Sequence, residues 1–164
     1  MGAINNAFNQ AAGAVAGSAV AIKHTKEVEL SKMQSADNAA LVARNQAKEA
    51  DAEKYAAKAK MEGPGGINEQ IDEAVEKSEK AAHRAGVARA INEVYPSPMN
   101  KGKAEKRTKE FKATQKALTF LRNSIKEEND VIKRAIEQRA HARKLTAIAY
   151  REKKRYKSRW GGIE

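Results

Sequence analysis

The sequence predicts an all-α protein with an extended fold of two or three long helices, arranged as a helical hairpin or a coiled coil. Helix-favouring Ala, Glu, Lys, Arg and Gln dominate its 164 residues. Leu, Ile, Val and Phe together make up only 26 of the 164 residues, which is too few for a large globular core. The three prolines, Pro64, Pro96 and Pro98, fall in only two short regions, so the stretches without proline are long. We therefore expect stability to come from packing against other copies or a partner, rather than from a compact globule.

Two breaks divide the chain, Gly63-Pro64-Gly65-Gly66 and Tyr95-Pro96-Ser97-Pro98, because proline and clustered glycine disfavour helix. A kink near His24 and Thr25 is one alternative for the first helical stretch. The expected segments are an uncharged Ala/Gly-rich helix or arm (1–22), an Ala-rich helix (23–62), a linker (63–67), a second helix (68–95), a second linker (96–102) and a long helix with a basic C-terminal segment (103–164).

Apolar residues recur three and four apart, which is the spacing of a helix-packing stripe. Between Met33 and Met61 this stripe consists almost entirely of Ala, and Lys54 alone interrupts it. An Ala stripe permits close helix approach but gives little hydrophobic free energy per contact. A weaker apolar face is expected on the second helix, made of Ile71, Ala74, Val75, Ala82, Ile91 and Val94. The predicted helix-packing residues are Ile4, Phe8, Val15, Ile22, Ala36, Ala40, Ala43, Ala47, Ala50, Phe111, Leu118, Leu121, Ile125 and Ile132.

Positive charge is concentrated in the last part of the chain. Residues 1–100 hold 12 Lys and Arg against 13 Asp and Glu, whereas residues 101–164 hold 20 against 8. Between Arg139 and Arg159 nine cations face Glu152 alone, with aromatic rings among them. Such a segment is typical of polyanion binding, to nucleic acid or to an acidic protein; the alternative is a solvated basic helix end. The candidate residues are Arg139, Arg143, Lys144, Arg151, Lys153, Lys154, Arg155, Lys157, Arg159 and Trp160.

The N-terminal segment has no charged side chain before Lys23. It is nearly long enough to cross a bilayer, but it is rich in Ala and contains several Asn. Gly13 and Gly17, four residues apart, would allow close packing in a membrane or in an assembly. Membrane contact through residues 3–22 and burial in an assembly both stay open as alternatives. No positively charged stretch precedes the apolar one, so a standard secretory signal is not predicted.

The sequence contains no pattern typical of an enzyme. There is no cysteine, the three histidines lie far apart, and no glycine-rich phosphate loop occurs. We therefore expect a non-enzymatic protein with no cofactor, no metal site and no small-molecule substrate.

The layout resembles minor virion proteins of bacteriophages that leave the capsid with the genome, the DNA pilot proteins of small phages above all. The stretch Ala11-Ala12-Gly13-Ala14-Val15-Ala16-Gly17 and the Ala-rich helix from Ala36 to Ala59 carry this resemblance. It implies a helical oligomer of the virion that packs with virion subunits and touches both DNA and membrane, or a cargo protein packed inside the capsid. In either case the protein would be in the host cytoplasm before assembly. The alternatives are a cellular nucleic-acid-binding or ribonucleoprotein helical protein and a membrane-associated coiled-coil scaffold.

Overall fold

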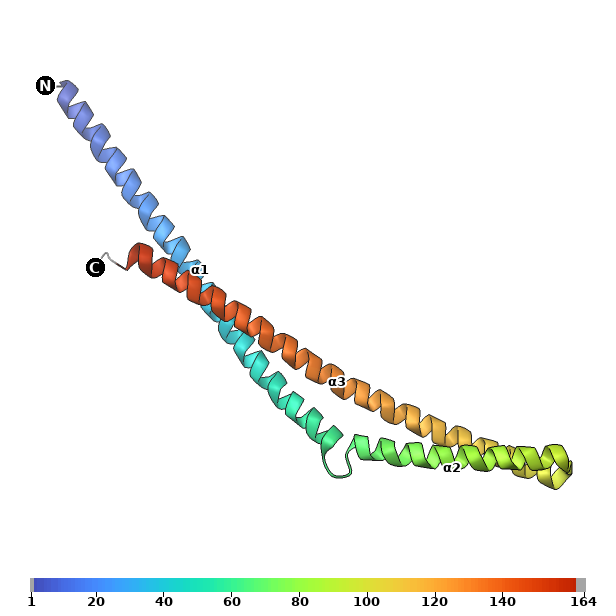
Figure 1. Ribbon diagram of the computed structural model, residues 1–164. Helices are drawn as coiled ribbons and strands as arrows, with labels where there is room; N and C mark the ends of the chain where they lie inside the picture. The colour runs from blue at the N-terminus through green and yellow to red at the C-terminus, as the bar shows by residue number, and fades with distance from the viewer. Residues whose placement is uncertain (1, 162–164) are drawn as a thin grey trace. The chain divides into compact units, whose positions relative to one another are not determined.

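The computed structural model describes residues 2–161, and it describes side chains from residue 9 onward. Three helices follow one another: α1 (Gly2–Glu62), α2 (Ile67–Val94) and α3 (Pro98–Trp160) (Figure 1). The described residues contain no strand, and the long helices pack against each other as a hairpin. The all-α prediction is therefore confirmed.

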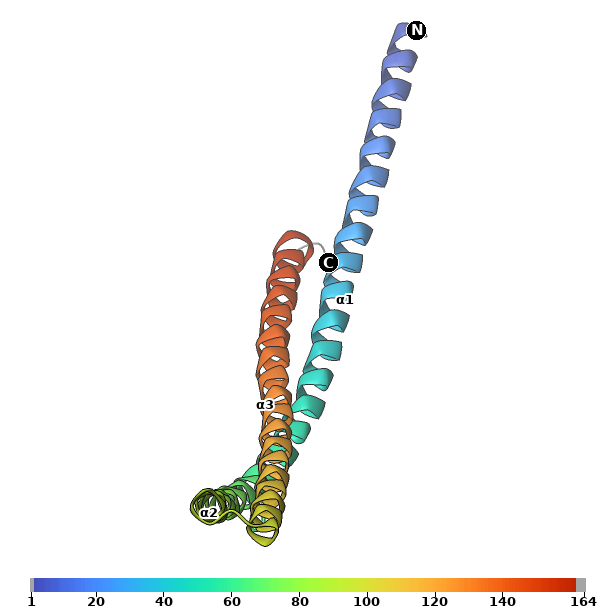
Figure 2. The ribbon, with the colours of Figure 1, turned by 90° about the vertical axis from the view of Figure 1, so that its right-hand side faces the viewer.

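The chain divides into two units. Unit 1 consists of Met1–Lys48 and Glu137–Glu164, and unit 2 consists of Glu49–Ile136. In unit 1 the light-blue to cyan part of α1, which follows its blue first part, lies beside the red last part of α3 in both views (Figures 1 and 2). Unit 2 contains the end of α1, the whole of α2 and the first part of α3. The two long helices thus each contribute to both units.

The helices bury alanine rather than large aliphatic side chains. Among the described residues, every buried hydrophobic residue except Met61 and Trp160 is Ala. In unit 1, Ala43 and Ala47 of α1 meet Ala142 of α3, with Leu145 packed at their edge. Small side chains let the helix backbones approach closely, but each contact removes little apolar surface from water. The core is therefore thin and runs along the helices.

The Ala stripe of α1 lies where its spacing predicts. Ala40, Ala43, Ala47, Ala50, Ala57 and Met61 are buried, and Ala36 is half-buried. Lys54, the polar member of this series, is half-buried. Its Nζ lies 3.1 Å from Oδ1 of Asp51 and 5.1 Å from the centre of the Tyr55 ring. A local carboxylate and a ring face thus compensate the charge that interrupts the stripe.

Other packing residues divide into half-buried and exposed groups. Five residues of α3 are half-buried: Phe111, Leu118, Leu121, Ile125 and Ile132. On α2, Ala74 of the expected face is buried and Ile71, Val75 and Ala82 are half-buried, whereas Ile91 and Val94 are exposed. Ala85, which was not expected on this face, is also buried. The expected face thus holds over residues 71–82, and the large side chains near the end of α2 face solvent. Ile91 and Val94 were therefore wrongly assigned to this face.

The helix is not interrupted near His24 and Thr25, where a kink was one alternative, since α1 continues through both residues. The Thr25 hydroxyl donates to the carbonyl of Ala21 at 2.9 Å, a bond that a helix accommodates at four-residue spacing.

The third helix begins at Pro98, five residues before the expected start. Ser97 caps it, accepting from the Asn100 amide at 3.0 Å, and proline suits the first helical position.

The α1–α2 connection depends on its glycines. Gly65 has a φ of +69°, which side chains rarely adopt. A Cβ on Gly66 would lie 2.6 Å from the carbonyl oxygen of Gly63 and 2.7 Å from that of Met61. The backbone amide of Gly65 donates to the Glu69 carboxylate at 2.8 Å, which places negative charge at the start of α2.

Candidate polyanion-binding surface

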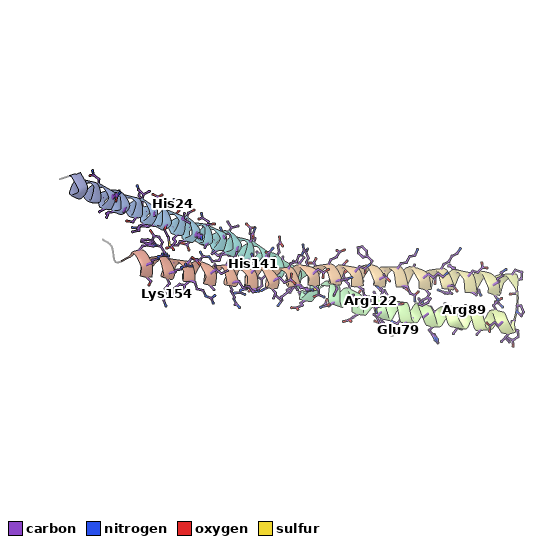
Figure 3. All side chains as sticks on the ribbon, turned by 90° about the horizontal axis from the view of Figure 1, so that it is seen from above. His24, Glu79, Arg89, Arg122, His141 and Lys154 are labelled. Carbon is purple, nitrogen blue, oxygen red and sulfur yellow. The ribbon has the colours of Figure 1, made fainter. Side chains whose placement is uncertain are left out.

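The basic segment at the end of α3 forms two different flanks in unit 1. One flank bears a shallow hollow lined by Tyr150, Lys153, Lys154, Lys157 and Ser158, which we call the lysine flank. These residues share a face because residues three and four apart are neighbours on a helix. Tyr150 is 68% exposed, and Figure 3 shows Lys154 on the side of α3 away from α1. The lysine flank therefore faces solvent.

The lysine flank is strongly positive because no carboxylate lines its hollow. Among the described residues, no ion pair or hydrogen bond involves the side chain of Lys153, Lys154 or Lys157. Three ammonium groups within five residues repel one another unless an anion lies between them. A phosphate group is such an anion, and an exposed tyrosine beside it provides a ring on which a base can stack.

The opposite flank of α3 is close to electrically balanced. Its hollow is lined by Glu29, Lys32, Glu152, Arg155 and Tyr156, which contribute two carboxylates and two cations. Arg155, one of the predicted polyanion-binding residues, thus lies beside acidic groups. The two flanks of α3 therefore differ in net charge, although the sequence shows a single basic run.

Two further candidates are engaged within the chain. Arg159 donates to Oε1 of Glu29, and the indole Nε1 of Trp160 donates to Oε2 of the same carboxylate. Trp160 is only 9% exposed, and the Arg159 guanidinium lies 5.3 Å from its ring centre. Trp160, a predicted polyanion-binding residue, is therefore not exposed for stacking on a base, because its indole packs in the helix interface. Nothing in the sequence indicated that Glu29 would bind both of these side chains, because it lies 130 and 131 residues away from them along the chain.

The remaining basic candidates lie on the surface of α3. Arg143, Lys144 and Arg151 are exposed, and Arg139 is exposed with an interaction partner in the chain. Their positions extend the positive charge along the helix without adding to the hollow of the lysine flank.

The N-terminal part of α1 has no packing partner within unit 1. Residues 9–24 are all exposed, including Val15 at 68% and Ile22 at 56%. This stretch extends past the end of α3, as the blue segment in Figure 1 shows. A Cβ on Gly13 or Gly17 would meet no atom within 4 Å. We call residues 9–22 the uncharged arm; Ile4 and Phe8 lie outside the residues whose side chains are described.

Other kinds of site have no support in the described part of the chain. It holds no group of three or more His, Asp or Glu side chains placed to bind a metal ion. No helix there combines the length and the apolar character needed to cross a membrane. Comparison with protein-family models, curated proteins and solved structures finds no match.

Proposed function

We propose that this chain is a non-enzymatic structural protein of a phage virion, an internal or genome-delivery component that contacts the genome through the lysine flank. The observation that most supports this proposal is the hollow lined by Lys153, Lys154 and Lys157, which contains no carboxylate and lies beside the exposed Tyr150 ring. The layout of an uncharged arm, Ala-packed helices and a basic helix end supports the virion setting.

Packing with other subunits forms the second part of the proposal. The uncharged arm is helical and exposed on every face, and its valine and isoleucine side chains remain in water in the single chain. Burying them against another copy or another virion subunit would gain about 25 cal/mol per Å² of apolar surface. Deleting residues 2–22 is expected to reduce self-association in sedimentation velocity while leaving DNA binding unchanged.

The lysine flank is tested with duplex DNA at a series of salt concentrations. K153Q/K154Q/K157Q removes its charge, and K23Q/K48Q/K58Q removes the same charge from exposed lysines elsewhere. Each lost phosphate contact lowers the slope of log K against log salt by about 0.9, so the first variant should lose about 2 to 3 in slope. The control variant should change the slope by much less.

Equal DNA binding by the two variants would reject the lysine flank as the genome contact. Loss of binding to an acidic protein, with DNA affinity unchanged, would favour the acidic partner instead. The virion setting has its own test, which is to search for peptides of this chain in purified phage particles from the source host. Their absence from the particles would reject that setting.

A further inference from the structure

A second cationic surface lies in unit 2, at the connection between α2 and α3. Residues 101–126 hold nine Lys and Arg against two Glu, whereas residues 127–138 hold two cations against four acidic residues. The positive charge of α3 therefore falls into two regions separated by an acidic one. Only the region at the end of α3 belongs to the lysine flank.

Two helices build this second surface. A hollow there is lined by Arg89 and Asn92 from α2 and, among others, by Lys101, Lys109 and Lys112 from α3. Lys112 also lines an adjoining hollow together with Gln115 and Lys116. We call Arg89, Asn92, Lys101, Lys109, Lys112 and Lys116 the turn surface. Figure 3 shows Arg89 on the stretch of α2 that accompanies the start of α3.

The connection between the helices holds the turn surface together. The side-chain amide of Asn100 donates to the carbonyl of Tyr95 at 2.7 Å, and Ser97 caps α3. Lys101 is therefore already helical, four residues after the cap. From Lys101 to Lys116 a helix rises about 22 Å, at 1.5 Å per residue. The four lysines thus form a row along one side of α3.

Most of this charge has no internal counterion. Glu105 is the one carboxylate that lines the two hollows. Among the described residues, no ion pair involves Arg89 or the four lysines of the turn surface. By contrast, Arg107 on the same helix pairs with Glu110 at 2.8 Å. The turn surface therefore remains strongly positive and is available to an external anion.

We propose that the turn surface binds the phosphate backbone of duplex nucleic acid, as a second site separate from the lysine flank. A row of about 22 Å spans several phosphates, because a duplex strand carries one charge per roughly 3.4 Å of its axis. The amides of Asn92 and Gln115 can donate to phosphate oxygens beside the lysines. The hydroxyls of Thr108 and Thr119, which also line the hollows, already donate to backbone carbonyls at 2.8 and 2.9 Å.

The lining favours nucleic acid over a lipid surface. Helices that lie in a membrane interface place large apolar side chains beside their cations. No large apolar side chain lines either hollow, and Ala104, the apolar residue that does, is buried. The ligand chemistry of the turn surface is therefore that of phosphates in water.

The test uses the full chain and duplex DNA of mixed sequence. K101Q/K109Q/K112Q/K116Q is compared with K23Q/K48Q/K58Q/K133Q, which removes the same charge from exposed positions outside both cationic surfaces. Gln favours helix about as well as Lys, so circular dichroism should report the same helix content for both. Both sets are also made in the K153Q/K154Q/K157Q background, and vesicles containing anionic lipid are tested in parallel.

We expect the turn-surface variant to lose about 3 to 4 in the slope of log K against log salt, and its control to lose much less. In the background without the lysine flank, it should abolish the remaining DNA binding. Equal binding by the variant and its control would overturn the proposal. Complete loss of DNA binding in the lysine-flank background alone, or a turn-surface effect on vesicles only, would also overturn it. If the turn-surface substitutions abolish DNA binding and the lysine-flank substitutions have no effect, the lysine flank is rejected as a DNA contact.

Discussion

Replacing Glu29 with Ala tests the contact that joins the two helices of unit 1 at the end of α3. The Glu29 carboxylate is 16% exposed and accepts from both Arg159 and Trp160. The substitution leaves the indole N–H without its acceptor in the interface. It also releases Arg159, which is half-exposed and ion-paired only through Glu29 among the described residues.

The free energy lost in E29A follows from the Trp160 hydrogen bond and the Arg159 ion pair. A hydrogen bond to a charged group contributes about 1.5–3 kcal/mol. The exposed Arg159 ion pair contributes only about 0.2–1 kcal/mol, because solvent screens it. Ala and Glu differ little in helix propensity. We therefore expect a loss of about 2 kcal/mol in the free energy that holds the last turn of α3 on α1, or about 30-fold in its equilibrium.

Fluorescence gives a direct assay because Trp160 is the single tryptophan of the chain. In E29A we expect its emission to shift to longer wavelength and acrylamide to quench it more strongly than in the unmodified protein. E27A is the matched control, since Glu27 is an exposed neighbour on the same helix. Unchanged emission and quenching in E29A, or equal changes in E27A, would refute the assigned contact.

Three further predictions concern unit 2. Ala85 is 0% exposed, so A85L should overpack the helix interface and lower the free energy of unfolding by about 1–3 kcal/mol. A90L, at an exposed position, should be near neutral in the same thermal melts, and an unchanged A85L melting temperature would contradict the packing. G66A should destabilise more than G65A in denaturant titrations, because its Cβ meets backbone oxygens at 2.6 and 2.7 Å, whereas G65A costs only the left-handed strain of about 1–2 kcal/mol. The reverse order would show that the connection adapts. The hydrogen bond and the charge of Lys80 lower the pKa of Glu76 below its ordinary value of 4.5. This pair therefore supports α2 at neutral pH and is lost as the pH falls through that lowered pKa; K80A should return the Glu76 pKa toward 4.5 in an NMR titration, and no change would remove Lys80 as the cause.

Local pattern predicted much of the fold. The spacing of three and four residues from Ala36 to Met61 correctly indicated which side of α1 is buried, because a helix repeats nearly every 3.6 residues. Pro64 and Pro96 correctly indicated where the helices end. The start of α3 was also readable in principle, since Ser97-Pro98 is a helix N-terminal signal. The expected start at residue 103 was too late, because Gly102 lies inside α3 and one glycine does not stop a capped helix.

The sequence by itself determined that this protein is helical, rich in alanine at its contacts and positively charged along α3, because composition and short-range spacing carry these properties. Tertiary structure alone decided which basic residues are available to a ligand. Glu29 lies 131 residues from Trp160 along the chain, yet it holds Trp160 and Arg159 in unit 1. Arg89 joins the lysines of α3 only because the chain reverses between α2 and α3. Charge neutralisation acts through space at a few ångströms, so a basic run in the sequence does not show which of its charges are already paired.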